Sequence, residues 1–273
     1  MNIGTNSLVD ELKDKILLAT EDLTHCLILE ADLIKTGTAI KTEYVLKIGK
    51  YEIERYNLYF EHVKLKRKIE LYQAAINKQQ RISHELVENI IKQETIEYQT
   101  ELNRLISDLH TANQIAKADS VTDEDLKMIK ETYRFIVMKI HPDLKVDQTD
   151  NDKFLWNMTQ NAYLDNDLQQ LLLVKSLIGN NDIDIKKENQ IDLLEKENMT
   201  LIFNIDLVKD RMNKMKNSFP FTKISLLQEE EAIKKIVKEI IVDINTYKQY
   251  NDELLERLKS LIDSLKKEGN LNE

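Results

Sequence analysis

Apolar residues recur at spacings of three and four along most of the chain, which is the spacing of one face of an α-helix. Over residues 7–35 a single charged residue, Glu30, interrupts this seam. The seam consists of Leu12, Ile16, Ala19, Leu23, Cys26 and Leu33. A break is expected at residues 35–38, which include Gly37, and a second long helix over residues 39–80.

Aromatic residues are concentrated along residues 39–80, and we attribute them to packing between long helices rather than to a ligand pocket. Gly49 predicts a local irregularity in this helix. A third helix is expected to begin after Ser83, which suits an N-cap, and to continue without interruption to about Ala118. Residues 1–120 are therefore expected to form a bundle or stalk of long helices.

Two shorter amphipathic helices, residues 123–140 and 151–164, flank the tripeptide His141-Pro142-Asp143. Pro142 has no amide hydrogen and biases His141 away from helical angles, so the first helix should end there. Two helices joined by a short polar loop are expected to lie antiparallel, with His141 and Asp143 displayed at one end.

A short helix over residues 168–178 carries an apolar stripe that suits the core of a small unit, residues 121–180. The polar stretch 179–182 begins with Gly179 and predicts a helix stop and a domain boundary.

The most regular pattern lies in residues 181–273, where spacings of three and four hold over residues 191–215 and again over 233–265. Sustained seams of this kind are typical of coiled coils. The segment 218–225, which contains Pro220, separates the two predicted helices.

Each of these seams contains one asparagine, Asn198 in the first and Asn251 in the second. A seam asparagine lowers stability but fixes register and partner number, because its amide needs a partner amide. An antiparallel hairpin within one chain would bring the two together, whereas a parallel homo-oligomer would pair each with its own copy. We favour the hairpin, with its turn at Pro220.

Composition supports an all-α fold, because the chain has only five Gly and two Pro and 32% charged residues. The net charge of −9 disfavours general nucleic-acid binding, which needs a basic excess. The densest basic run, residues 64–68, lacks interleaved aromatic residues, so we interpret it as a solvated helix face or a contact with an acidic protein. A nucleic-acid anchor at this run is the weaker reading.

Several site classes are disfavoured by the residues present. Cys26 is the only cysteine, which excludes an intrachain disulfide and a cysteine-based zinc site. His25, His62, His84 and His110 are scattered without ligand spacing, so no metal or other cofactor is expected. No apolar run has the length of a membrane span and residues 1–12 show no secretory signal, so we expect a cytoplasmic protein.

The segment from Tyr133 to Asp143 resembles the second helix and signature loop of a J-domain, the module of DnaJ-type co-chaperones. In that family a tyrosine, basic and apolar residues, a lysine and an aromatic residue precede His-Pro-Asp, and an Ala-Tyr helix follows. Ala162-Tyr163 matches that helix, with Trp156 in place of phenylalanine. The resemblance covers about a fifth of the chain. Helical spacing also puts Tyr133, Ile136 and Val137 on one face of the first helix. The expected core of the J-like unit consists of these three residues with Trp156, Ala162 and Tyr163.

Three features depart from the family pattern. Phe135 stands where a second basic residue is usual, and Leu144 follows the tripeptide where lysine is common. No Tyr-x-x-Leu-Gly helix precedes Thr122, and the long helix ending near Ala118 is expected to replace it. The Gly/Phe-rich linker and Cys-rich zinc region of general DnaJ chaperones are also absent, which favours a dedicated client or adaptor.

The resemblance implies that His141, Pro142 and Asp143 contact a DnaK-type heat-shock chaperone and stimulate its ATP hydrolysis. A positive helix face would steer the loop to an acidic partner surface, and this attraction should weaken as salt rises. The face consists of Lys127, Lys130, Arg134 and Lys139. No nucleophile motif accompanies His141, so the chain is interpreted as a non-enzyme.

The alternative from another class is a structural coiled-coil scaffold whose J-like unit has no chaperone partner. Its sequence support is the pair of substitutions at Phe135 and Leu144. On that reading the tripeptide is only a helix stop, and the lysines are the solvated face of a surface helix.

Overall fold

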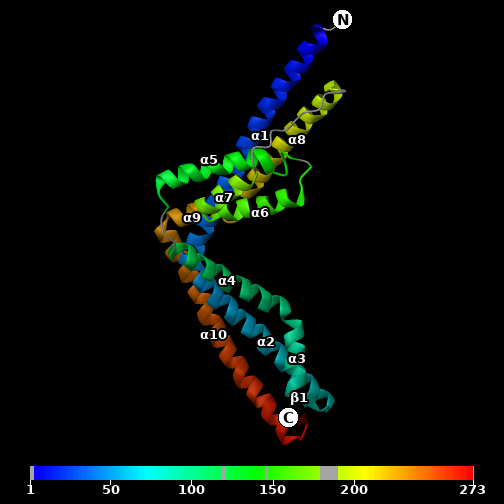
Figure 1. Ribbon diagram of the computed structural model, residues 1–273. Helices are drawn as coiled ribbons and strands as arrows, with labels where there is room; N and C mark the ends of the chain where they lie inside the picture. The colour runs from blue at the N-terminus through cyan, green and yellow to red at the C-terminus, as the bar shows by residue number, and fades with distance from the viewer. Residues whose placement is uncertain (1–2, 118–120, 146, 179–189, 273) are drawn as a thin grey trace. The chain divides into compact units, whose positions relative to one another are not determined.

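The computed structural model describes residues 3–117, 121–145, 147–178 and 190–272 and confirms the all-α class (Figure 1). The α-helices are α1 (Ile3–Tyr44), α2 (Lys50–Lys78), α3 (His84–Glu94), α4 (Ile96–Lys117), α5 (Asp123–Ile140), α6 (Asp150–Leu164), α7 (Leu168–Ile178), α8 (Gln190–Lys216), α9 (Ile224–Gln228) and α10 (Glu230–Lys267). Within the described ranges the one strand pairing is parallel, between β1 (Ile82–Ser83) and β2 (Leu271–Asn272). Ala118 and the helix stop expected at 179–182 lie outside the described residues.

Helix α1 continues through Gly37, so the break expected at residues 35–38 was wrong. A Cβ atom at Gly37 would lie 3.1 Å from Cε2 of the Phe221 ring, in the short 3₁₀ turn η2 (Phe221–Lys223). Glycine is present here because a ring packs closely against the helix backbone, which a local turn rule does not reveal.

The irregularity predicted at Gly49 is confirmed, because residues Val45–Gly49 form a π-helical turn, η1, between α1 and α2. Ser83 is confirmed as an N-cap, since its Oγ accepts a hydrogen bond of 3.1 Å from the Leu86 amide. The uninterrupted third helix was wrong. It divides at Thr95, whose backbone angles (φ −112°, ψ 14°) leave the helical region. The Thr95 hydroxyl donates to the Ile91 carbonyl at 2.7 Å, and the Thr95 amide donates to the same carbonyl at 3.0 Å.

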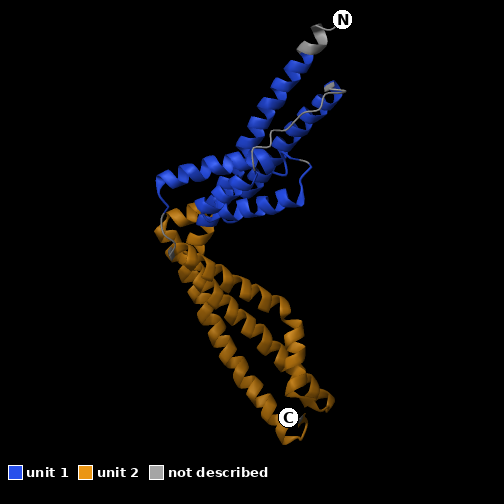
Figure 2. Ribbon diagram, in the orientation of Figure 1, with its two compact units in different colours: residues 1–39, 119–222 blue, residues 40–118, 223–273 orange. Residues whose placement is uncertain are grey.

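The chain divides into two compact units, each assembled from separated segments (Figure 2). Unit 1 comprises residues 1–39 and 119–222, and unit 2 comprises residues 40–118 and 223–273. These units differ from the expected ranges 1–120, 121–180 and 181–273. Helix α1 contributes to both units, because its residues up to 39 belong to unit 1 and its last turn belongs to unit 2.

Unit 1 has a single core that joins the inner faces of α1, α5, α6, α7 and α8. The segment of α1 around Leu23, which is 0% exposed, takes the central place that the sequence assigned to the helix ending near Ala118. Cys26 is buried in the same core, and burial raises the pKa of its thiol. A buried thiol of raised pKa is a packing residue rather than a nucleophile.

Unit 2 is organised around α2, which packs along α10 and also contacts α4. One core joins α2, α3 and α10 through residues such as Tyr72, Val87 and Leu265. A second core surrounds the π-turn and includes Ile48, Ala112 and Ile244. These apolar contacts satisfy the three-and-four seams that the sequence shows in α2 and α10.

The predicted C-terminal coiled-coil hairpin is not formed, because α8 belongs to unit 1 and α10 to unit 2. The Asn251 amide donates to the Leu58 carbonyl of α2 at 2.9 Å, and its oxygen lies 3.1 Å from Nδ1 of His62. Asn251 therefore fixes the register of α10 on α2 rather than pairing with Asn198. Self-association through the Asn198 seam stays a prediction, which the mass in solution would check.

Candidate functional site

The His141-Pro142-Asp143 loop lies where α5 ends and the chain turns back into α6, which runs in the opposite direction (Figure 1). At the start of α5 the Thr122 hydroxyl accepts a hydrogen bond of 3.1 Å from the Asp125 amide. At its end His141 has extended backbone angles, and its amide donates to the Val137 carbonyl at 3.1 Å. The helix stops here because Pro142 favours an extended residue before it.

The second half of the loop is fixed by the start of α6. Thr149 and Asp152 form a reciprocal capping box, which sequence reading did not identify. The Lys145 ammonium lies 2.7 Å from the Asp152 carboxylate and is the main reason that the pKa of this carboxyl is lowered. The Gln148 amide donates to the Ile140 carbonyl at 2.6 Å, so the loop is tied to both helices.

The residues expected to form the core of the helix pair are brought together. The Tyr133 and Tyr163 rings stack with centroids 3.9 Å apart, and Trp156 lies 6.1 Å from Tyr133. All six expected core side chains are buried: Tyr133, Ile136, Val137, Trp156, Ala162 and Tyr163. The helix pair is therefore closely packed next to the loop.

Helix α1 also contributes to this core and contacts α6. The Tyr163 hydroxyl donates to the Asp32 carboxylate at 2.5 Å, and burial is the main cause of the raised pKa of Tyr163. The Lys35 ammonium lies 4.8 Å from the centroid of the Tyr163 ring and also bonds to Asn166. No sequence pattern links Asp32 to Tyr163.

His141 is held as a neutral imidazole. Its side chain is buried, so the expectation that His141 is displayed at the end of the helix pair was wrong. The ring is drawn inwards because it packs edge-on against Trp156, with centroids 4.4 Å apart. The Asp143 amide donates to Nδ1 of His141 at 3.0 Å, so this nitrogen carries no proton. Burial lowers the pKa of His141 to about 4, an effect that the Asp143 carboxylate opposes and the Arg211 guanidinium reinforces.

We expect His141 to make unit 1 acid-sensitive. Because its folded pKa of about 4 lies below the ordinary value of 6.5, its contribution to stability is complete above pH 6.5 and is lost as pH falls towards 4. The measurement is urea unfolding of the wild type and His141→Gln across that window. The variant should lose less stability on acidification, whereas His110→Gln, an exposed histidine of α4, should follow the wild type. Parallel losses in all three proteins would contradict the assignment.

Asp143 is bound by α8 as well as by its own loop. The Asn204 amide donates to the Asp143 backbone carbonyl at 3.0 Å, and Nη2 of Arg211 donates to its carboxylate at 3.0 Å. Arg211 also bonds to Glu30 of α1 through Nε at 2.8 Å and Nη2 at 3.0 Å. Sequence reading missed Asn204 and Arg211, although Glu30, the one charged residue in its seam, was a signal that a polar partner faces it.

The four basic residues assigned to α5 do not form one uniform surface. Lys127 and Arg134 are exposed, whereas Lys139 is half-buried. Lys130 is exposed and lies 3.4 Å from Asp32. Positive charge is therefore available to a partner mainly at Lys127 and Arg134, with Lys130 shared with α1.

The side chains of Phe135 and Leu144, two of the three features that depart from the J-domain pattern, pack against the core of unit 1. The Lys175 ammonium of α7 lies 5.1 Å from the centroid of the Phe135 ring. Lys175 thus places a cation beside Phe135.

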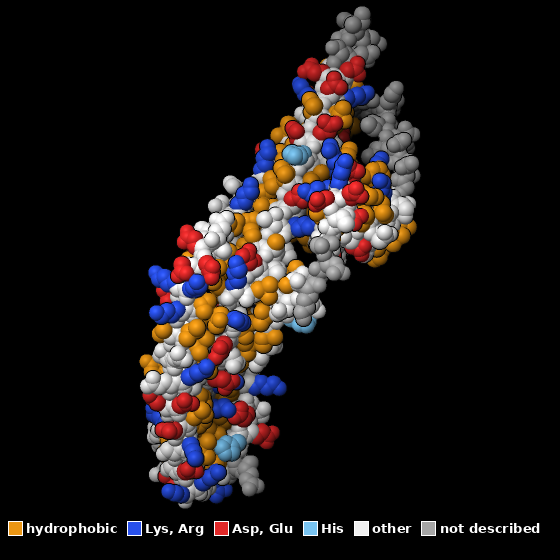
Figure 3. All heavy atoms as spheres, turned by 90° about the vertical axis from the view of Figure 1, so that its left-hand side faces the viewer, with side chains coloured by type: hydrophobic (Ala, Val, Ile, Leu, Met, Phe, Trp, Pro, Cys, Tyr) orange, Lys and Arg blue, Asp and Glu red, His pale blue; other side chains and the backbone are white. Residues whose placement is uncertain are grey.

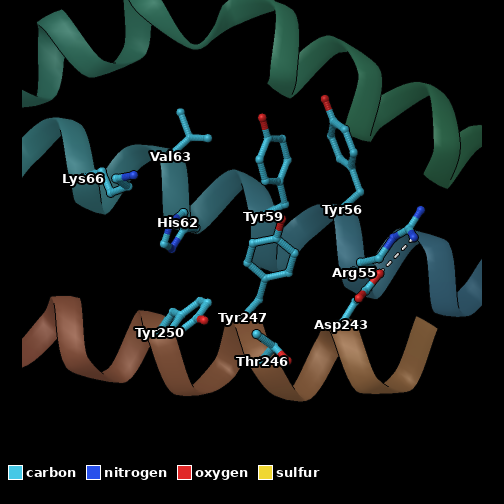
Figure 4. Close-up of a pocket in the computed structure, with 10 residues that line it drawn as sticks. All are labelled: Arg55, Tyr56, Tyr59, His62, Val63, Lys66, Asp243, Thr246, Tyr247 and Tyr250. Carbon is cyan, nitrogen blue, oxygen red and sulfur yellow. Dashed lines mark hydrogen bonds and ion pairs between the residues drawn. The ribbon is translucent and has the colours of Figure 1, made fainter. Parts of the chain in front are cut away.

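An open groove of about 740 Å³ lies in unit 2, lined by side chains of α2 and α10 (Figure 4). Tyr247 and Tyr250 extend from α10 towards α2, and the Tyr59 and Tyr247 ring centroids lie 5.8 Å apart. The groove also includes Tyr56. Aromatic packing between helices holds as predicted for the buried Phe60 and Tyr72 and also for Tyr59, whose ring contacts Tyr98 of α4 and Tyr247 of α10. Tyr59 and Tyr247 also line the groove, and Tyr250 is exposed in it.

The ends of the groove carry charge. The Arg55 guanidinium pairs with Asp243 at 3.3 Å, while the exposed Lys66 lies at the other end (Figure 4). Two cations and one carboxylate thus line the groove. Tyrosine rings offer rigid contact area at low entropic cost, so a surface of this kind suits an amphipathic segment.

The basic run at residues 64–68 is largely neutralised by neighbouring carboxylates. Lys64 pairs with Glu61, Arg67 with Glu70 and Glu94, and Lys68 with Glu88. The face drawn in Figure 3 likewise shows basic and acidic side chains interspersed. A phosphate backbone would have to compete with these pairs.

Within the described ranges, no cluster of three or more His, Cys, Asp or Glu side chains is arranged to hold a metal ion. None of the described helices combines the length and apolar character needed to span a bilayer.

Comparison with known proteins finds no matching family model, curated protein or solved structure. The class of the protein is therefore defined by its own fold. It is an all-α protein of two helical units, one of which presents a His-Pro-Asp loop at the end of a helix pair.

Proposed function

We propose that the protein is a cytosolic co-chaperone of J-domain type, which recruits a DnaK-type ATPase through His141-Pro142-Asp143 and stimulates its ATP hydrolysis. On this proposal unit 2 binds a dedicated client or adaptor. The chain supplies no catalytic group of its own, because the hydrolysis takes place in the partner.

The observation that carries the proposal is the fixed geometry of the loop. Pro142 is exposed. The preceding residue, His141, is buried against Trp156, and its Nδ1 accepts a hydrogen bond from the amide of the following residue, Asp143. A corner held this firmly loses little entropy on binding, which favours recognition by a partner. The exposed Lys127 and Arg134 on α5 add positive charge beside it.

The proposal is tested by adding the full-length protein to a DnaK-type chaperone and measuring steady-state ATP turnover. We expect stimulation at low salt that declines as ionic strength rises from about 0.05 M to about 0.3 M, because exposed charges are screened over that range. The double variant Lys127→Glu, Arg134→Glu should stimulate less than the wild type at low salt, whereas Lys66→Glu in unit 2 should stimulate as the wild type does. Salt-independent stimulation that survives the double substitution would contradict steering by α5.

Client binding is assigned to the tyrosine groove of unit 2, and the occupant we propose is an acidic amphipathic helix. Its apolar face would pack on Tyr59, Tyr247 and Tyr250, and an acidic residue would reach Lys66. The support is the open aromatic wall together with the excess of cations that line it.

A fluorescent model peptide of about 18 residues, five helical turns, with leucine on one face and glutamate on the other, probes this groove. Tyr247→Ala should weaken its binding about tenfold, since central aromatic residues dominate such contacts. Tyr51→Ala, on α2 but outside the groove, is the matched control. Equal binding of a leucine–lysine peptide, or no effect of Tyr247→Ala, would remove the assignment.

A structural scaffold whose J-like unit engages no chaperone is the second candidate. The observation that favours it is that Arg211 already binds the Asp143 carboxylate within the chain, while Asn204 binds the Asp143 backbone carbonyl. Phe135 and Leu144, packed against the core, also reduce the polar surface of the loop region. Absence of any stimulation by the folded full-length protein would select this reading.

A further inference from the structure

Helix α8 binds the candidate loop through two residues that lie seven positions apart on one side of the helix. Asn204 donates to the backbone carbonyl of Asp143, and Arg211 donates to its carboxylate. Both polar contacts converge on the last residue of the tripeptide. Sequence patterns place neither residue at the loop.

Helix α1 holds the Arg211 side chain in place from the other side. Arg211 holds the Glu30 carboxylate with two of its nitrogens, at 2.8 and 3.0 Å, while Nη2 also reaches Asp143. A guanidinium has a planar fork of donors, so it serves both carboxylates without rotating. Glu30 thereby positions Arg211 over the loop before any partner arrives.

The same helix is seated in the core of unit 1 by apolar side chains. Leu201, Ile205 and Val208 are buried among residues of α1, α5 and α6. The Arg211 side chain is 44% exposed and that of Asp143 is 29% exposed. An ion pair this open to solvent contributes little net free energy, so a competing charge is able to displace it.

We propose that Arg211 and Asn204 form an intramolecular latch on Asp143, which must open before a chaperone binds the loop. The inference rests on the proposed function and deepens it by assigning regulation to the same site. A partner's cation that seeks Asp143 competes with Arg211 for one carboxylate oxygen. The latched fraction of the protein is therefore withheld from the partner, which raises the concentration needed for stimulation without altering the maximal rate.

The experiment compares wild type, Arg211→Ala and Asn204→Ala as full-length proteins in a titration of ATP turnover by a DnaK-type chaperone. Arg211→Ala is expected to lower the half-saturating concentration about two- to sixfold, the range that corresponds to release of a fraction latched by an exposed ion pair. Asn204→Ala should shift it in the same direction, and maximal turnover should stay constant in both. Arg104→Ala, which removes an arginine paired with Glu101 and Asp108 in unit 2, is the matched control and should shift nothing.

Circular dichroism and urea unfolding establish whether each variant is folded. If Arg211→Ala does not fold, Asn204→Ala provides the test of the latch. A raised half-saturating concentration in folded Arg211→Ala would mean that Arg211 supports the active loop, and this would overturn the latch. An unchanged value would also overturn it. Absence of stimulation by the wild type and every folded variant would instead overturn the proposed function, and the latch with it.

Discussion

Replacing His141 with glutamine is expected to reduce the stimulated ATP turnover of a DnaK-type chaperone to its basal rate. The imidazole packs edge-on against Trp156 and accepts the Asp143 amide through Nδ1, so it sets the backbone of the tripeptide. Glutamine has neither a ring for Trp156 nor an acceptor at the same place, and Asp143 would lose its fixed position.

The matched control is His110→Gln, because His110 is an exposed histidine of α4 in unit 2. It should stimulate as the wild type does at every concentration. Circular dichroism and urea unfolding show whether His141→Gln keeps its fold. Equal stimulation by His141→Gln and wild type would exclude the loop as the contact and favour the scaffold.

Substitution of Leu23 by alanine is expected to destabilise unit 1 by about 2–5 kcal/mol, the usual cost of a buried leucine with its cavity. Leu23 is 0% exposed, in the core that α1 shares with α5, α6 and α8. Leu17 lies on the same helix but is 59% exposed, so Leu17→Ala should change stability by no more than about 0.5 kcal/mol.

Urea unfolding followed by tryptophan fluorescence measures this difference selectively, because Trp156 is the only tryptophan and belongs to unit 1. The comparison tests whether α1 is an essential part of the core of unit 1. Indistinguishable midpoints for Leu23→Ala and Leu17→Ala would show that α1 is dispensable to the core.

The parts of the site that sequence predicted are those fixed by local chemistry. Helical spacing placed Ile136 and Val137 on a buried face. Pro142 correctly indicated that α5 ends near His141, since its last helical residue is Ile140. Ser83 and Gly49 were informative for the same reason, since caps and helix irregularities depend on a few neighbouring residues.

What sequence did not reveal depends on contacts between distant segments. A three-and-four seam states which face of a helix is buried but not which helix covers it, so α8 and α10 were paired with each other instead of with separate units. Gly37 was read as a break because its partner, the Phe221 ring, is remote in the chain. Arg211 was overlooked because an arginine beside a seam is ordinary until Glu30 and Asp143 are seen around it.

The discontinuous make-up of the units has a consequence for synthesis on the ribosome. Neither unit is complete until its last helix emerges, since unit 1 needs α8 and unit 2 needs α10. Arg211 follows Asp143 by 68 residues, which takes about 3 to 14 s at ordinary elongation rates of about 5–20 residues per second. A nascent chain therefore passes through an interval in which Asp143 has been made and the arginine that binds it has not.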